Sequence, residues 1–211
     1  MRWEVNVIRD FYIIEHLPDR KGVPSFIPKI WLPELPDIHY ATEAPLRENF
    51  AEKYKLKANA YQLDGDYLIS DNLISSGCYE LFNTFSVNFI GIPVDICLLR
   101  GKVPGKKYFL FFLSDYLSIL DVGTSIFTIS RDIYTNKLNT PEDRGLDRVY
   151  YEKIEKFRIK ENLSNHLFFC IEISKHVCSG EFKDKFESLG FKGVKFIKID
   201  DSYIYDPWAG W

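Results

Sequence analysis

Short apolar runs separated by turn residues dominate the chain from residue 60 onward. The run "KKYFLFFLS" follows the turn pair Pro104-Gly105, and the runs "YLSILDV" and "SIFTIS" flank Gly123, which predicts a hairpin that "RDIYTNKL" continues. The runs "EKFRIKE" and "HLFFCIEI" predict two further strands. Because consecutive strands with short connections pair with their neighbours, the predicted fold class is α+β, a mostly antiparallel β-sheet with a few short helices.

The first 60 residues carry a different pattern. "MRWEVNVIRDFYIIEH" predicts one or two strands, and six of the ten prolines then fall between Pro18 and Pro45. Since proline lacks an N–H and holds its predecessor extended, this stretch cannot be a regular helix or a central strand. We expect an extended arm pinned to the body by large apolar residues, and a proline-rich peptide ligand is the functional alternative. The apolar residues are Phe26, Ile30, Trp31 and Leu32.

A short helix is predicted after the arm, because Leu46, Phe50 and Tyr54 have the spacing of one helix face. We interpret residues 1–211 as a single globular domain. In it, residues 1–60 supply N-terminal strands and the proline-rich arm, and residues 61–211 form the α+β body.

Two stretches resemble each other at an offset of 104 residues: "ISDNLISSGCYELFNTF" from Ile69 and "ISKHVCSGEFKDKFESL" from Ile173. In each, a serine (Ser75 or Ser179) precedes apolar residues at helix spacing, and its side chain can cap the helix N-terminus. The apolar residues are Cys78, Phe82 and Phe85 in the first stretch, and Phe182, Phe186 and Leu189 in the second. The likeness indicates a duplicated strand–helix–strand unit, with chance as the alternative.

Composition excludes several classes of protein. Hydrophobic residues make up 46% of the 211 residues and aromatic residues 16%, which indicates a fully folded chain. The net charge of -3 gives no indication of a face that binds nucleic acid. No signal peptide or membrane-spanning run is found, and the four cysteines show no C-x-x-C spacing, so we expect a cytoplasmic protein.

His176 and Cys178 stand two residues apart before the second predicted helix, which fits either a nucleophile with its base or plain packing. In the alignment of the two stretches, Ile74 holds the position of Cys178, and Phe182 holds that of Cys78. Sites that accept a large apolar residue favour buried, structural cysteines.

Metal and catalytic motifs are weak throughout. His166 and Cys170 share a strand face but lie ~13 Å apart, too far to share a zinc ion. Asp64 and Asp66 could bind magnesium, although Asp-Gly is also a turn signal. We therefore expect no metal, no cofactor and no catalytic residues, and predict that the protein is not an enzyme.

The segment "LFFCIEISKHVCSGEFKDKFESLGFKGVKFIKI" resembles the ending of bacterial polymorphic-toxin immunity proteins, in particular the immunity protein 43 family. The resemblance covers roughly residues 65–200. It is carried by Glu172-Ile173, Ser179, Phe182, Lys183, Phe186, Gly190, Phe191, Gly193, Val194 and Phe196. Lys198 stands where related proteins often have proline. The resemblance implies a cytoplasmic antitoxin without catalysis, which binds a cognate toxin domain and occludes its active site.

The C-terminal tail, "IDDSYIYDPWAGW", combines carboxylates with large aromatic residues. Tyr and Trp often anchor interfaces, and carboxylates beside them suit a basic partner such as a nuclease toxin. The alternative is that the aromatic residues fold back and close the core. The candidate partner-binding residues are Asp200, Asp201, Tyr203, Tyr205, Asp206, Trp208 and Trp211.

Three functions therefore stay open at this point: a toxin-neutralising binding protein, a small cysteine-dependent enzyme using Cys178 and His176, and a peptide-binding or scaffold module using the proline-rich arm or a sheet edge. The first predicts a protein partner, no nucleic acid or membrane partner, and a monomer or weak dimer.

Overall fold

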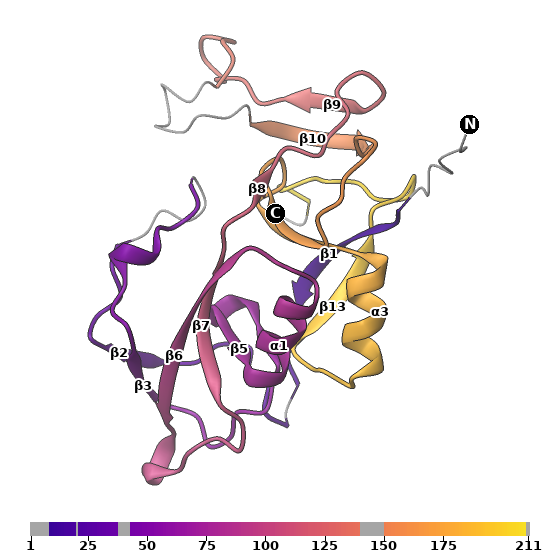
Figure 1. Ribbon diagram of the computed structural model, residues 1–211. Helices are drawn as coiled ribbons and strands as arrows, with labels where there is room; N and C mark the ends of the chain where they lie inside the picture. Colours follow the sequence, from indigo (N-terminus) through magenta and orange to yellow (C-terminus); the bar gives the residue numbers. More distant parts are fainter. Residues whose placement is uncertain (1–8, 20, 38–42, 140–149, 210–211) are drawn as a thin grey trace.

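The computed structural model describes residues 9–19, 21–37, 43–139 and 150–209. Within these ranges the chain forms two large β-sheets, a small two-stranded sheet and two α-helices (Figure 1). The predicted α+β class with mostly antiparallel strands is confirmed.

The first large sheet has the strand order β2-β3-β6-β7-β5-β4, and β3–β6 is its parallel pair. Its strands are β2 (Lys29–Leu32), β3 (Tyr54–Ala58), β4 (Tyr67–Leu68), β5 (Leu73–Ser75), β6 (Phe89–Cys97) and β7 (Tyr108–Leu113). Strand β7 is covered on both faces: Leu110 and Phe112 join one apolar cluster, while Phe111 and Leu113 join another. A strand covered on both faces needs apolar residues at successive positions, which explains the unbroken run "YFLFFL".

The second large sheet has the order β13-β1-β12-β11-β8. Its strands are β1 (Phe11–His16), β8 (Tyr116–Leu117), β11 (Leu167–Cys170), β12 (Lys175–Ser179) and β13 (Val194–Lys198). The N-terminal strand β1 lies between β12 and β13 and pairs antiparallel with both. The first residues of the described chain are therefore an integral part of the body.

The two similar stretches fold into the same unit. In each, an antiparallel hairpin (β4–β5 or β11–β12) leads into a helix of nine residues, α1 (Ser76–Thr84) or α3 (Gly180–Ser188). The chain then returns as β6 or β13, and one antiparallel strand, β7 or β1, lies between the two strands that the helix connects. In the first unit the inserted strand, β7, follows β6 in the chain. In the second unit the inserted strand, β1, is the first strand of the described chain.

Both predicted helix caps are confirmed. Ser75 Oγ accepts the N–H of Cys78 at 3.2 Å, and Ser179 Oγ accepts the N–H of Phe182 at 3.2 Å. These bonds satisfy backbone donors that the first turn of a helix cannot satisfy itself.

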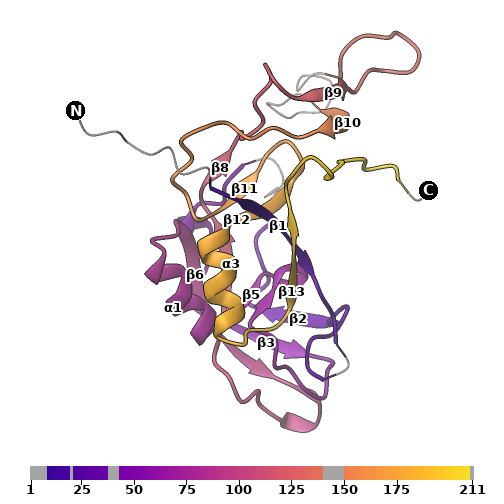
Figure 2. The same cartoon turned by 90° about the vertical axis from the view of Figure 1, so that its right-hand side faces the viewer.

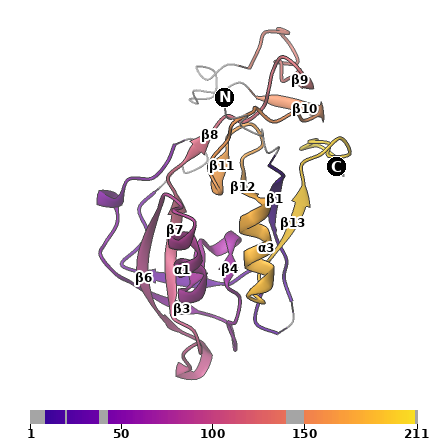
Figure 3. The ribbon, with the colours of Figure 1, turned by 45° about the vertical axis from the view of Figure 1, so that its right-hand side comes forward.

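Helices α1 and α3 lie side by side against the two sheets (Figure 3), and the rings of Phe82 and Phe182 are 5.8 Å apart. Cys78, Phe82, Phe182 and Phe186 are buried as predicted. Leu189 was expected in the core and is 46% exposed, because it follows the last turn of α3, where the chain turns away through Gly190 (φ +67°).

The turn between α3 and β13 joins the two units. The carbonyl of Lys192 accepts the N–H groups of Asp66 at 2.7 Å and Tyr67 at 3.1 Å. A Cβ on Gly193, which has φ +119°, would stand 2.3 Å from the Tyr67 carbonyl oxygen. Only glycine allows this close approach of two backbones.

The segment before β4 differs from the predictions. Instead of a helix through Leu46, Phe50 and Tyr54, a single 3-10 turn, η1 (Arg47–Asn49), precedes β3. Tyr54 belongs to β3 because the alternation of buried and exposed residues around Leu56 suits a strand between β2 and β6. Two further 3-10 turns are η2 (Ile69–Asp71) and η3 (Leu99–Gly101).

The proline-rich stretch contains the edge strand β2, a position that proline-flanked strands tolerate. Of the residues expected to pin it, Trp31 packs against the first apolar cluster. Phe26, Ile30 and Leu32 are exposed at 71%, 62% and 42%. Instead of these three residues, Ile27 and Val23, at 0% and 1% exposure, hold the segment against the body.

Candidate partner-binding surface

The candidate surface lies on a small lobe, whose strands are at the top of Figure 1 and whose C-terminal tail runs below them. The lobe consists of β9 (Ile126–Ile129), β10 (Tyr151–Lys156), the loop 130–139 and the tail 200–209. The N–H of Ile154 donates to the carbonyl of Tyr205 at 2.9 Å, and the N–H of Tyr205 donates back at 3.0 Å. The tail therefore pairs with β10 at a single antiparallel bridge.

Two predicted contact residues of the tail belong to the interior. The ring of Tyr203 lies 6.2 Å from that of Phe157, and Tyr203 and Tyr205 both pack against the third apolar cluster, which includes Ile154. Burial raises the pKa of both tyrosine hydroxyls. These side chains anchor the tail to the body and are half-buried structural groups.

The tail carboxylates are partly engaged within the chain. Asp201 pairs with the guanidinium of Arg158 at 2.5 Å. Asp200 accepts the hydroxyl of Ser202 at 2.6 Å and its N–H at 2.8 Å, and these bonds lower the pKa of Asp200. Asp206 Oδ1 accepts the N–H of Trp208 at 3.0 Å, which fixes the backbone at the tryptophan.

Trp208 is 67% exposed, and it does not close the core. Trp211 lies outside the described residues. The structure thus divides the predicted set. Tyr203 and Tyr205 hold the tail, Asp201 and Trp208 are exposed, and Asp200 and Asp206 are partly exposed.

The most exposed apolar pair of the lobe was missed by the sequence analysis. Ile133 and Tyr134, at 85% and 90% exposure, stand in the loop 130–139. Asp132 Oδ1 accepts the N–H groups of Tyr134 at 3.0 Å and Thr135 at 2.7 Å and the Thr135 hydroxyl at 2.8 Å. The Thr135 backbone bond and then its hydroxyl hold the pKa of Asp132 below its usual value.

The apolar pattern of "RDIYTNKL" predicted a continuing strand, and this prediction is wrong. The segment is a loop, which the bridge between Arg131 and Leu138 closes. The available signal was Asp132 followed by Thr135 and Asn136, since a leading Asp with such residues favours a turn in which its carboxylate binds the following N–H groups. This turn signal would have placed Ile133 and Tyr134 at the tip of a loop.

The His176–Cys178 pair is arranged for packing. Cys178 is fully buried, and burial raises the pKa of its thiol well above the usual value. His176 Nδ1 lies 2.7 Å from the Tyr67 hydroxyl, and burial lowers the pKa of His176 to about 3. A neutral imidazole beside a protonated thiol lacks the thiolate that cysteine nucleophiles need. A cavity of about 180 Å³ borders His176, with Phe111, Tyr116 and Phe169 among its lining residues.

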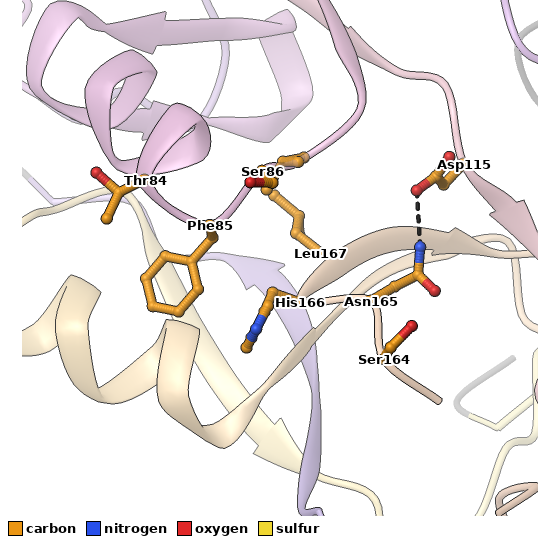
Figure 4. A pocket seen from close by; sticks show the side chains of 9 residues that line it. Thr84, Phe85, Ser86, Asp115, Ser164, Asn165, His166 and Leu167 are labelled. Atoms are coloured by element: carbon orange, nitrogen blue, oxygen red, sulfur yellow. Dashed lines mark hydrogen bonds between the residues drawn. The ribbon is translucent and has the colours of Figure 1, made fainter. Parts of the chain in front are cut away.

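His166 and Ser179 form a second pair of catalytic residue types. Nδ1 of His166 lies 2.8 Å from Ser179 Oγ, beside a cavity of about 520 Å³ at the end of α1 (Figure 4). Burial and then the charge of Arg9 lower the pKa of His166. Ser179 is 0% exposed and caps α3, so a substrate has no access to its hydroxyl.

The first unit uses a carboxylate in the corresponding place. Ser75 donates to Asp66 Oδ1 at 2.7 Å, and the buried Asp66 binds Lys106 Nζ at 3.0 Å. Asp64 pairs with Lys106 at 3.2 Å and with Lys192 at 3.1 Å. Asp64 and Asp66, the candidate magnesium ligands of the sequence, therefore face lysine ammonium groups.

Cys170 and His16 also have structural partners. The thiol of Cys170 donates to Glu172 at 3.2 Å, and His16 Nε2 lies 3.0 Å from the Pro24 carbonyl. Across the residues with described positions, no group of three or more potential metal-ligating side chains comes together.

Comparison with known proteins gives no relative: the chain matches no family model and no curated protein. None of the helices in the described part of the chain is both long and apolar enough to cross a membrane.

Proposed function

We propose that this chain is an immunity protein, a cytoplasmic antitoxin that binds a cognate toxin domain of a bacterial polymorphic toxin and occludes its active site. The proposal draws on the resemblance of residues 65–200 to that class. The observation that carries it is the lobe, where the exposed Trp208 stands beside Asp206 on a tail that Tyr203 and Tyr205 anchor. An anchored, exposed tryptophan is typical of a binding hot spot.

The residues that carry the resemblance serve the scaffold. Ser179 caps α3, Phe182 and Phe186 fill the central cluster, and Gly193 allows the close contact between the two units. They support a shared fold, whereas a contact surface has to be sought among exposed residues. The lobe offers such residues on a rigid support.

The chemistry of the buried groups favours binding over catalysis. Burial raises the pKa of the thiols of Cys78, Cys170 and Cys178, so the protonated, weakly nucleophilic form dominates at neutral pH. Ser75 and Ser179 are engaged as helix caps. These groups stabilise the body that presents the lobe.

A peptide-binding module is the second candidate, and strand β2 is the observation that favours it. This strand lies at the edge of the first sheet, and its side chains Ile30 and Leu32 are exposed at 62% and 42%. An extended peptide could add to this edge by main-chain hydrogen bonds.

The immunity function predicts that a neighbouring reading frame encodes a polymorphic toxin, and its test uses the full chain with the C-terminal domain of that toxin. We expect tight one-to-one binding in calorimetry and rescue of growth when the two are co-expressed. Trp208→Ala is expected to weaken binding at least about 10-fold. Phe26→Ala, which removes an aromatic ring 71% exposed near β2, is the matched control and should leave the affinity unchanged.

Two outcomes would count against this proposal. Absence of binding and of growth rescue with the wild-type chain would refute the immunity function. Loss of binding with Phe26→Ala, and none with Trp208→Ala, would move the contact to the β2 edge and favour the peptide-binding candidate.

A further inference from the structure

Two exposed aromatic residues of the lobe lie in the same kind of turn, which an aspartate carboxylate stabilises. In Asp132-Ile133-Tyr134 and in Asp206-Pro207-Trp208, the carboxylate accepts the N–H of the aromatic residue two positions later, at 3.0 Å in both cases. Each turn fixes the backbone of a side chain that is mostly in solvent, 90% for Tyr134 and 67% for Trp208.

Strand register brings the two turns to the same end of the lobe. Tyr151, at the start of β10, pairs with Ile129, directly before the loop 130–139. The tail crosses β10 antiparallel at the Tyr205–Ile154 bridge, so residues after Tyr205 run toward the start of β10. In Figure 2 the loop after β9 and the end of the described tail both extend to the right of the molecule, the loop above β10 and the tail below it.

We infer that Ile133, Tyr134 and Trp208 form one two-part contact surface, which seats the loop 130–139 in an apolar pocket of a protein partner and Trp208 against a basic rim of that pocket. This inference rests on the proposed immunity function and specifies its partner chemistry: the toxin domain would present a concave apolar site with cationic residues beside it.

The shape and charge of the surface select this partner. Ile133 and Tyr134 occupy a protruding loop, so their partner must supply the concave side. Asp200, Asp201 and Asp206 belong to the same tail as Trp208. Asp201 is paired with Arg158, and the bonds from Ser202 lower the pKa of Asp200. These carboxylates oppose an anionic membrane or a nucleic acid and suit a basic rim.

The braced turns also reduce the entropy lost on binding. Ordering a loop during association lowers affinity, whereas a loop already fixed in the free protein avoids that loss. Asp132 alone accepts bonds from two backbone N–H groups and one hydroxyl. The Arg131 guanidinium adds a bond to the carbonyl of Asn136 at 3.0 Å, so both sides of the loop tip are tied together.

The test compares two double variants of the full chain by calorimetry against the neighbouring toxin domain. Ile133→Ala with Tyr134→Ala should weaken binding at least about 100-fold, because each is expected to act as a hot spot. Tyr61→Ala with Val103→Ala removes a similar pair, exposed at 63% and 75%. Tyr61 lies near Arg100 in η3, on the turn between β6 and β7 at the bottom of Figure 1, and this control should bind as wild type.

Unfolding midpoints of all variants should match wild type, because the altered residues are exposed. Wild-type toxin affinity of the Ile133/Tyr134 variant would overturn this inference and leave the immunity function standing. Failure of the wild-type chain to bind the toxin would refute the proposed function and the inference together. Sedimentation of the wild type, but not of this variant, with vesicles of phosphatidylserine and phosphatidylcholine would overturn the inference in favour of a membrane contact.

Discussion

In the two strand–helix–strand units the aromatic side chains are buried, whereas in the lobe several of them face solvent. Phe186 in α3 is 1% exposed, and its ring lies 5.5 Å from Phe196 and 5.4 Å from Phe191. Tyr134 in the lobe is 90% exposed. The same residue class therefore builds a core in one region and an exposed surface in the other.

The difference follows from the connections of each region. In the units, α1 and α3 cover one face of β7, and the segment with Val23, Ile27 and Phe50 covers the other. In the lobe, two short strands and a tail leave their outer surface open, and the Asp132 turn holds Ile133 and Tyr134 away from the third cluster. Stability should thus respond to changes in the units, and binding to changes in the lobe.

The largest expected effect comes from a buried aromatic residue of the two strand–helix–strand units. Phe186→Ala should lower the free energy of unfolding by ~3–5 kcal/mol, the usual cost of truncating a buried phenylalanine. Urea unfolding measures this loss. Leu189→Ala, one turn further along but 46% exposed, is the internal control and should change the free energy by less than about 1 kcal/mol. Equal losses for the two variants would contradict the assigned helix face.

Deletion of residues 203–211 should cost about 2–3 kcal/mol, because two half-buried tyrosines leave the third cluster. Trp208→Ala should stay within about 0.5 kcal/mol of wild type. Thermal and urea unfolding of the two variants compare the anchored and exposed parts of the tail. An unchanged stability of the deletion variant would show that Tyr203 and Tyr205 do not hold the tail.

The imidazole of His176, which is partly buried beside the Tyr67 hydroxyl, predicts a loss of stability in mild acid. Its pKa is about 3 in the folded chain and near 6.5 when exposed, so the unfolded chain binds more protons between these values. The stability contribution is complete above pH 6.5 and falls, by up to about 1.4 kcal/mol per pH unit, as the pH drops toward 3.

Urea unfolding of wild type and His176→Gln between pH 7 and pH 5 isolates this contribution from other titrating groups. The wild type should lose more stability than the variant over this range. Parallel pH profiles for the two proteins would show that His176 is not held neutral by burial.

The smallest effect distinguishes the two helix caps. Ser179→Ala should cost about 1 kcal/mol, the usual value of an N-cap. Ser75→Ala should cost more, because it also removes a donor to the buried carboxylate of Asp66, whereas the partner of Ser179 is the less buried His166. A larger loss for Ser179→Ala in urea unfolding would reverse this ranking.

Local patterns predicted what depends on neighbouring residues. Ser75 and Ser179 as caps, the buried Cys78 and Cys178 and the α+β class all follow from spacing within a short window. The apolar run of β7 likewise reported a strand, since every position is covered.

These short patterns could not predict the pairing of strands that are far apart in the sequence. Nothing in "FYIIEH" indicates that β1 lies between β12 and β13, because its partners are more than 160 residues away. Helix spacing at Leu46, Phe50 and Tyr54 was misleading because the strands beside β3 decide its structure. Trp208 was proposed from its residue type, while the exposure of Ile133 and Tyr134 was not predicted because their apolar pattern outweighed the turn signal of Asp132.

The central claim is that the lobe, and not the body, contacts the partner. Hydrogen–deuterium exchange of the full chain with and without the neighbouring toxin domain tests it most directly. We expect slower exchange in the complex at residues 130–139, 150–156 and 200–209, with β2 and its flanking residues 26–32 unchanged. Protection confined to residues 26–32, with the lobe exchanging as in the free protein, would contradict it.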